Sequence, residues 1–117
     1  MMQGNGIQKV FLEDEAIGWE VIGEGLRRKV MAWDEWVMLV KVEFQKWAIG
    51  AVHQHPHSQV SYVESGVFEV EISGERRVLK AGDVFLAPSN TSHGVLCLEA
   101  GVLIDVFSPL REDLLPR

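Results

Sequence analysis

Hydrophobic and polar residues alternate with a period of two from Met38 onward, which is the pattern of a half-buried β-strand. The longest example spans residues 38–45, in which every second position is apolar: Met38, Val40, Val42 and Phe44. The same alternation recurs over residues 68–73. A turn at Gly74 leads from there into residues 76–79, so these two segments predict a β-hairpin.

Further short strands are expected at residues 84–87, 93–98 and 102–107, and polar turns lie between them. Short strands that recur with turn signals favour an all-β sandwich or barrel, with the jelly roll among the options. Helical turns are expected at only two places, Asp34 to Val37 and the tail after Pro109.

Length and charge narrow the class of protein. The 117 residues predict a single domain over 1–117, because no linker, charge block or repeat divides them. No stretch approaches the roughly 20 apolar residues of a membrane span, and Met1 to Gln8 lacks the features of a signal peptide, so a cytoplasmic location without a membrane partner is expected. The net charge of −6 argues against nucleic acid as a partner. The one cysteine, Cys97, excludes an internal disulfide.

The histidines are concentrated in one place. Of only four in the chain, three are His53, His55 and His57, and Gln59 shares their parity. One straight strand over these positions would be about 20 Å long, far too long for a single ion with bonds of about 2 Å. Pro56 is the expected bend. We therefore predict that His53 and His55 end one strand, that His57 lies in the connection and that Gln59 begins the next strand.

A fourth candidate ligand, His93, stands at the head of a later strand, and with it the pattern resembles the cupin superfamily. The first cupin motif is carried by residues 53–66 and the second by residues 82–93. The resemblance implies a single-domain cupin, a double-stranded β-helix or jelly-roll barrel over about 36–108. It also implies one divalent metal, held by four residues: His53, His55, Gln59 and His93.

Four positions depart from the usual cupin motifs. Trp47 and Asn90 stand where Gly is common, and Cys97 stands where Asn is common. Gln59 replaces the usual glutamate, and its neutral oxygen leaves the charge of a metal uncompensated, which favours a Lewis acid over a redox centre. Zinc, nickel, iron and manganese all remain candidates. We expect His57 to lie off the ligand face, at the rim of the site.

The last predicted strand carries an isolated acid. Leu103, Asp105 and Phe107 share one face, and the opposite face is also apolar. A carboxylate among such neighbours is unfavourable unless it is paired or used. Asp105 is therefore expected to point into the barrel beside Phe107, the alternative being a terminal strand that exposes it to solvent.

The tail makes the resemblance more specific. Asp105, Phe107, Ser108-Pro109 and Arg111-Glu112-Asp113, taken with residues 53–59, resemble the KdgF-type cupins of pectin and alginate breakdown. Those enzymes convert 4,5-unsaturated monouronates to linear keto acids. The resemblance implies a ring-opening isomerase whose substrate is a small anionic sugar, and it makes Asp105, Phe107 and Arg111 the substrate-binding and catalytic residues. The alternative for Arg111 is a solvated surface charge.

Other functions fit the same fold. An iron-dependent dioxygenase or a sugar-acid isomerase of another kind would use the same metal ligands, and a non-catalytic module could bind a sugar acid without turnover. Resemblance to other small cupins also implies a homodimer.

Overall fold

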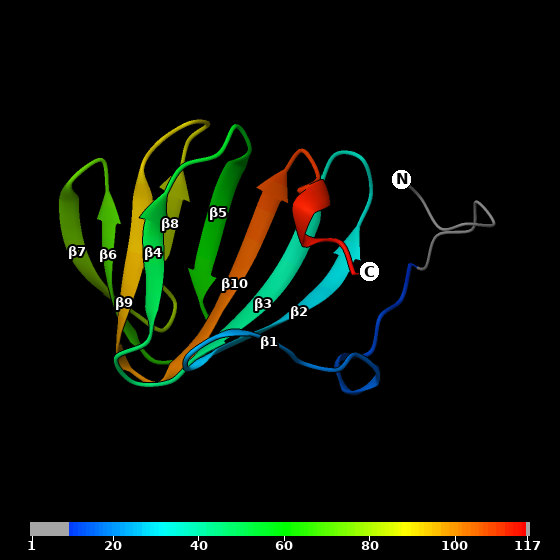
Figure 1. Ribbon diagram of the computed structural model, residues 1–117, viewed down its shortest axis with the longest axis horizontal. Helices are drawn as coiled ribbons and strands as arrows, with labels where there is room; N and C mark the ends of the chain where they lie inside the picture. Colours follow the sequence, from blue (N-terminus) through cyan, green and yellow to red (C-terminus); the bar gives the residue numbers. More distant parts are fainter. Residues whose placement is uncertain (1–9, 117) are drawn as a thin grey trace.

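The structure, a computed structural model, describes residues 10–116, and its regular secondary structure consists of β-strands and two short 3-10 turns (Figure 1). All pairings between these strands are antiparallel. The six-stranded sheet contains, in spatial order, β1 (Glu20–Gly23), β2 (Leu26–Trp33), β3 (Met38–Phe44), β10 (Gly101–Ser108), β5 (Ser58–Val63) and β8 (Val84–Ala87). The four-stranded sheet contains β4 (Ile49–His53), β9 (His93–Glu99), β6 (Val67–Ile72) and β7 (Glu75–Lys80).

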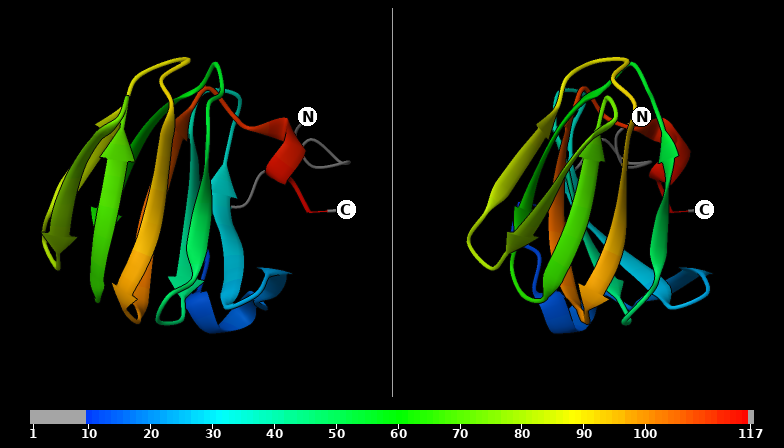
Figure 2. Two further views of the ribbon diagram at one scale, coloured as in Figure 1. Left: turned by 60° about the vertical axis from the view of Figure 1, so that its left-hand side comes forward. Right: turned by 90° about the vertical axis from the view of Figure 1, so that its left-hand side faces the viewer.

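The two sheets pack face to face into a jelly-roll barrel, as the all-β prediction expected (Figure 2). In strand β3, buried and half-buried residues alternate along the whole strand. The alternation of apolar and polar residues in the sequence therefore matches the burial of the strand. The core between the sheets is formed by the inward apolar residues, among them Met38, Val40, Val63, Phe68 and Cys97. Burial of these side chains is the main favourable contribution to folding.

Two expectations about helical turns had different outcomes. The tail does contain a turn of 3-10 helix, η2 (Glu112–Leu114). Asp34 to Val37 is not helical and closes the β2–β3 hairpin instead. Asp34 Oδ1 accepts hydrogen bonds from the backbone amides of Trp36 and Val37, at 2.8 and 3.0 Å. These bonds form a turn, and the backbone amide of Asp34 donates to the carbonyl of Val37 at 2.9 Å, so the chain returns into β3 instead of continuing as a helix.

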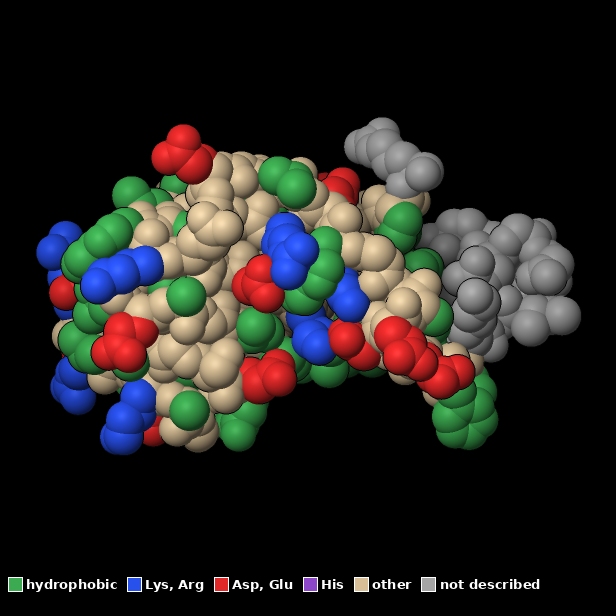
Figure 3. All heavy atoms as spheres, turned by 90° about the horizontal axis from the view of Figure 1, so that it is seen from below, with side chains coloured by type: hydrophobic (Ala, Val, Ile, Leu, Met, Phe, Trp, Pro, Cys, Tyr) green, Lys and Arg blue, Asp and Glu red, His purple; other side chains and the backbone are tan. Residues whose placement is uncertain are grey.

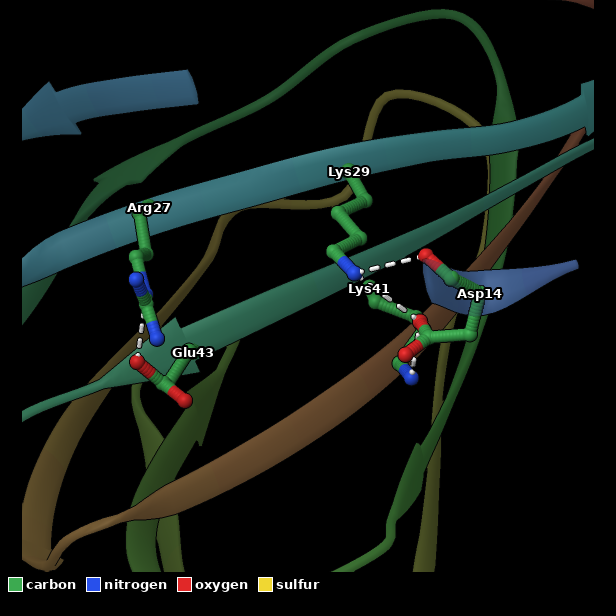
Figure 4. Close-up of polar contacts among 5 residues, drawn as sticks. All are labelled: Asp14, Arg27, Lys29, Lys41 and Glu43. Atoms are coloured by element: carbon green, nitrogen blue, oxygen red, sulfur yellow. Dashed lines mark hydrogen bonds and ion pairs between the residues drawn. The ribbon is translucent and has the colours of Figure 1, made fainter. Parts of the chain in front are cut away.

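A second 3-10 turn, η1 (Asp14–Ala16), holds the N-terminal segment against the six-stranded sheet (Figure 4). Asp14 Oδ1 lies 2.8 Å from Lys41 Nζ and 3.2 Å from Lys29 Nζ. Lys29 is buried and also donates to the backbone carbonyl of Asp14, at 2.8 Å. Hydrogen bonds from Lys41 and Lys29 hold the pKa of Asp14 below its usual value. This contact fastens a segment that has no strand of its own.

The predicted ligands lie in or next to the loops at one end of the barrel. In Figure 1 the β4–β5 and β8–β9 connections lie at the same end as the last residue of β10. Figure 3 views the other end, where no histidine of the described residues is visible. Among residues 10–116, no helix is long and apolar enough to cross a membrane. The prediction for Met1 to Gln8 lies outside the described residues.

Candidate metal centre and cavity

The β4–β5 connection carries the chain from one sheet to the other and places the clustered histidines. β4 ends at His53, so His55 lies in the connection together with His57, and Gln59 is the second residue of β5. The prediction that His55 ends the strand was therefore wrong by two residues. The reason is that a chain that crosses between sheets leaves its ladder before the bend at Pro56. His53 is paired directly with His93 of β9.

Each of the three converging imidazoles donates one ring N–H to a backbone carbonyl. His53 Nδ1 lies 2.8 Å from the carbonyl of Ala51, His55 Nδ1 lies 2.9 Å from that of His57, and His93 Nδ1 lies 2.8 Å from that of Thr91. A carbonyl can only accept, so these contacts assign the hydrogen to Nδ1 and leave Nε2 with a free lone pair in the neutral ring. This is the tautomer of a histidine that binds a metal through Nε2.

Gln59 completes a set of four acceptors. Its Oε1 lies 3.1 Å from Nε2 of both His55 and His93. Ligand atoms of His53, His55 and His93 all lie within 4.8 Å of one another. An amide oxygen cannot donate to these nitrogens, so with neutral rings lone pairs face lone pairs unless a cation lies between them. The four groups therefore fit a divalent transition metal, for which imidazole nitrogen is a common ligand.

Burial keeps two of these imidazoles neutral. Desolvation is the main cause that lowers the pKa of His55, although the contact with Gln59 acts in the opposite direction. Desolvation also lowers the pKa of His93, against its bond to the carbonyl of Thr91. Only a neutral imidazole can offer Nε2 to a metal, so burial favours the binding form.

Behind Gln59, a chain of hydrogen bonds leads to Asp105. Gln59 Nε2 donates to Ser61 Oγ at 2.9 Å, and Ser61 Oγ donates to Asp105 Oδ1 at 2.6 Å. Asp105 of β10 is paired with Ser61 of β5 in the ladder, which places the two side chains on the same inner face. Asp105 thus points into the barrel, and the alternative of a solvent-exposed aspartate does not apply.

The environment of Asp105 is unfavourable for a charge. Burial raises the pKa of its carboxyl to about 6, although the hydrogen bond from Ser61 and the charge of Arg111 lower it. A carboxyl that titrates near neutral pH can both accept and donate a proton under ordinary conditions. Perturbed groups of this kind cluster at functional sites.

Arg111 is placed beside the cavity by the C-terminal tail. The backbone amide of Leu110 donates to the carbonyl of Glu35 at 3.2 Å, which holds the tail against the β2–β3 turn. The guanidinium lies 5.1 Å from the centre of the Phe107 ring, and Arg111 Nη2 donates to Asp113 Oδ2 at 2.7 Å. This bond is the main cause that lowers the pKa of Asp113. The side chain of Arg111 is only 16% exposed, so it is not a solvated surface charge.

These groups line one cavity of about 230 Å³ inside the barrel. Its polar residues are His53, Gln59, His93, Asp105, Arg111 and Arg28. Phe107 and several apolar core residues form the remaining wall. The cavity therefore combines a cluster of metal-binding groups, an acid and two positive side chains, enclosed mostly by apolar surface.

Two residues near this cavity were not found from the sequence. Ser61 has the same parity as Gln59, and Arg28 has the same parity as Leu26 and Val30, so alternation could have indicated both. Asp113 belonged to the tail motif of the resemblance, but its contact with Arg111 was not predicted. His57 is half-buried outside the group of three histidines, and it contributes its backbone carbonyl to His55.

Two departures from the cupin motifs have a backbone explanation. Trp47 and Asn90 have positive φ values of 73° and 58°. Both positions need the left-handed conformation that glycine adopts most readily, and Asn tolerates it better than other residues with a side chain. The larger Trp47 has its side chain 61% exposed, so the unusual backbone is compatible with the fold without crowding the core.

Comparisons with known proteins agree with this description. The cupin-domain family matches residues 40–107, which contain the three histidines of the cluster. The pectin degradation protein KdgF of Dickeya dadantii is 49% identical over 111 residues, which make up 93% of this chain and 100% of that protein.

Two solved structures of similar sequence have nearly the same fold. An RmlC-like cupin from Shewanella frigidimarina is 45% identical, with a TM-score of 0.90, over 92% of this chain and 97% of that one. KdgF from a Halomonas species is 42% identical, with a TM-score of 0.89, over 92% of this chain and 100% of that one.

Proposed function

The chain belongs to the cupin family and is a KdgF-type member of it, and from this premise we propose that it opens 4,5-unsaturated monouronates to linear keto acids in a metal-dependent isomerisation. The observation that carries the proposal is the cavity itself. It is lined by His53, His93, Gln59, Asp105 and Arg111, and His55 contacts Gln59 beside it.

The substrate's carboxylate would bind Arg111. A guanidinium offers two parallel N–H donors to a carboxylate, and a partly enclosed position strengthens that bond. In a chain with a net charge of −6, a local positive group is needed to admit an anion at all. Phe107 gives the sugar ring an apolar surface beside that group.

Asp105 would move the protons. Ring opening breaks the bond between C1 and the ring oxygen, transfers the proton of the C1 hydroxyl to that oxygen and leaves an aldehyde and an enol. The enol hydroxyl then loses its proton and C4 gains one, which gives the ketone. No electrons enter or leave, so one carboxyl that accepts and returns a proton is sufficient.

The metal would be held by His53, His55, His93 and Gln59. Such an ion supplies Lewis acidity toward a substrate oxygen and helps to hold the sugar in place.

The direct test follows the conjugated double bond of the monouronates that a pectate or alginate lyase releases. The protein is expected to make the absorbance decay faster than buffer does, and Asp105→Asn is expected to lose about a hundredfold or more in kcat. Arg111→Ala is expected to raise KM, because it removes a bond made to the bound substrate. Glu64→Gln, on an exposed loop position, is the matched control for loss of a carboxylate.

Two results would contradict the proposal. Decay no faster than in buffer, together with tight uronate binding, would favour a non-catalytic module. Oxygen consumption by the iron-loaded protein would favour a dioxygenase. The predictions of a homodimer and of a cytoplasmic location stay predictions, and measurements of mass in solution and of location in the cell test them.

A further inference from the structure

Ser61 lies between Asp105, the proposed proton-transfer group, and Gln59, a proposed metal ligand. The proposed reaction gives Ser61 no role. It is fully buried in the middle of β5. Its hydroxyl contacts two side chains from opposite sides, Gln59 Nε2 at 2.9 Å and Asp105 Oδ1 at 2.6 Å. A buried hydroxyl that bridges two side chains lining a cavity is a candidate positioning residue.

The direction of the hydrogen bonds follows from the number of protons. A serine hydroxyl has one proton to donate, and an ionised Asp105 can only accept it. Ser61 Oγ then accepts a hydrogen bond from Gln59, so the NH₂ group of Gln59 faces Ser61. Because the amide is planar, its Oε1 faces the opposite way, toward His55 and His93.

We propose that Ser61 is a positioning residue that couples Asp105 to the metal centre by fixing the amide of Gln59 with its oxygen toward the histidines. The role assigned to Asp105 rests on the proposed function. The role assigned to Gln59 rests on the contacts alone.

The hydrogen bond to Ser61 opposes the orientation that the side-chain amide of Gln59 would otherwise prefer. Without a metal, Nε2 of His55 and His93 would attract the NH₂ group of Gln59, since an N–H donor satisfies a free lone pair. Turning the amide in this way would place two hydrogens where a cation has to sit. Ser61 makes that turn unfavourable, because it would leave the hydroxyl oxygen without its donor.

The first measurement is Zn²⁺ binding to the metal-free protein by calorimetry. Ser61→Ala is expected to lower the affinity about tenfold or more, which is the usual effect of removing a group that orients a metal ligand. Ser61→Thr keeps the hydroxyl and is expected to retain most of the affinity. Ser58→Ala, at an exposed position of the same strand, is the matched control and should match the wild type.

The second measurement reports the amide directly. In spectra of the metal-free protein, the Gln59 amide protons should show nuclear Overhauser contacts to Ser61 in the wild type. In Ser61→Ala they should show contacts to the imidazole protons of His55 or His93. This readout separates a turned amide from a general loss of structure, and the Thr variant keeps the test usable if the Ala variant does not fold.

The third measurement determines kcat and KM, and it tests the coupling of Ser61 to the proposed proton transfer by Asp105. Ser61→Ala is expected to lower kcat while KM for the monouronate changes little, since Ser61 does not contact the substrate. Unchanged Zn²⁺ affinity and unchanged amide contacts in a folded Ser61→Ala would overturn the proposal, and so would a Thr variant as impaired as the Ala variant. A wild type that binds Zn²⁺ but converts no uronate would contradict the proposed function, while the first two measurements still decide the role of Ser61.

Discussion

Asp105 shows at the scale of one residue how a functional group opposes stability. Its carboxyl lies among apolar neighbours that raise its pKa to about 6, and Ser61 and Arg111 compensate only in part. The side chain could have been asparagine at little cost in shape. An acid at this position lowers stability, and this cost is consistent with the proposed role of Asp105 in proton transfer. Function and stability often oppose each other at active sites.

The raised pKa makes a prediction about stability and pH. The folded value of about 6 exceeds the ordinary value of 3.8, so the folded state holds its proton more tightly and ionisation of Asp105 destabilises the metal-free protein above pH 6. Asp105→Asn should therefore be more stable than the wild type at pH 8, by at most about 3 kcal/mol. The difference should shrink as the pH falls from 6 toward 4.

Urea denaturation of the metal-free proteins at pH 5 and pH 8 measures this difference. Glu64→Gln is again the control, because its carboxylate is exposed. A gap between the wild type and Asp105→Asn that stays constant over this pH range would show that burial does not perturb Asp105.

At the scale of elements, alternation identified β3 and β6, turn signals and short apolar runs identified β7 to β10, and β1 and β2 were not predicted. β3 and β6 were predicted because their inner residues are apolar and their outer residues charged. β1 was missed because all four of its residues are exposed. In β2 the inner face includes Arg28, and a register shift between Val30 and Ala32 interrupts the period of two.

The connections between elements depend on close backbone approach. Gly66 has φ of +85°, and a Cβ there would lie 2.6 Å from the carbonyl oxygen of Glu99 and 2.7 Å from the Cα of Gly101. The β5–β6 turn therefore packs directly against the β9–β10 turn. Gly74 has nearly the same φ, +83°, but nothing lies within 4 Å of its Cβ position.

Substitution of Gly74 and Gly66 by alanine separates two contributions to the loss of stability, the left-handed backbone conformation and the steric crowding. Gly74→Ala should lower the free energy of unfolding by about 1 kcal/mol, which is the cost of a left-handed alanine. Gly66→Ala should lower it by about 2 kcal/mol more, since the atoms in its way belong to the backbone and cannot rotate aside. Urea denaturation of both variants tests the prediction, and equal losses would show that the two turns can move apart.

At the scale of the whole molecule, the barrel is held by its apolar core, and the candidate metal centre lies at one end of it. The acceptors of the centre come from β4, the β4–β5 connection, β5 and β9, so they are brought together only in the folded state. An ion that binds there should stabilise the whole fold, because the unfolded chain offers no such cluster.

Zn²⁺ at about a thousand times its Kd should stabilise the protein by about 4 kcal/mol, and a chelator should remove the effect. The measurement is the Tm with and without the ion. His93→Ala should lose most of the shift, whereas His57→Ala should keep it, since its backbone carbonyl still fixes His55. An equal shift in His93→Ala and the wild type would place the ion elsewhere.

The sequence by itself determined the fold class and named most of the candidate groups around the cavity, although it missed Arg28 and Ser61. Alternation with a period of two depends only on which residues share a face of a strand, and the spacing of His53, His55, Gln59 and His93 follows a known motif. These properties are local, so they can be taken from the order of the residues.

Only the tertiary structure decided which faces meet. The pairing of β10 with β5 joins positions 44 residues apart and sets Asp105 against Ser61. The direction of each imidazole was decided by a backbone carbonyl two residues away, and the position of Arg111 by a tail that bonds to the β2–β3 turn. The physical reason is that periodicity specifies the side on which a residue lies, whereas strand order and register arise from the packing of the entire barrel.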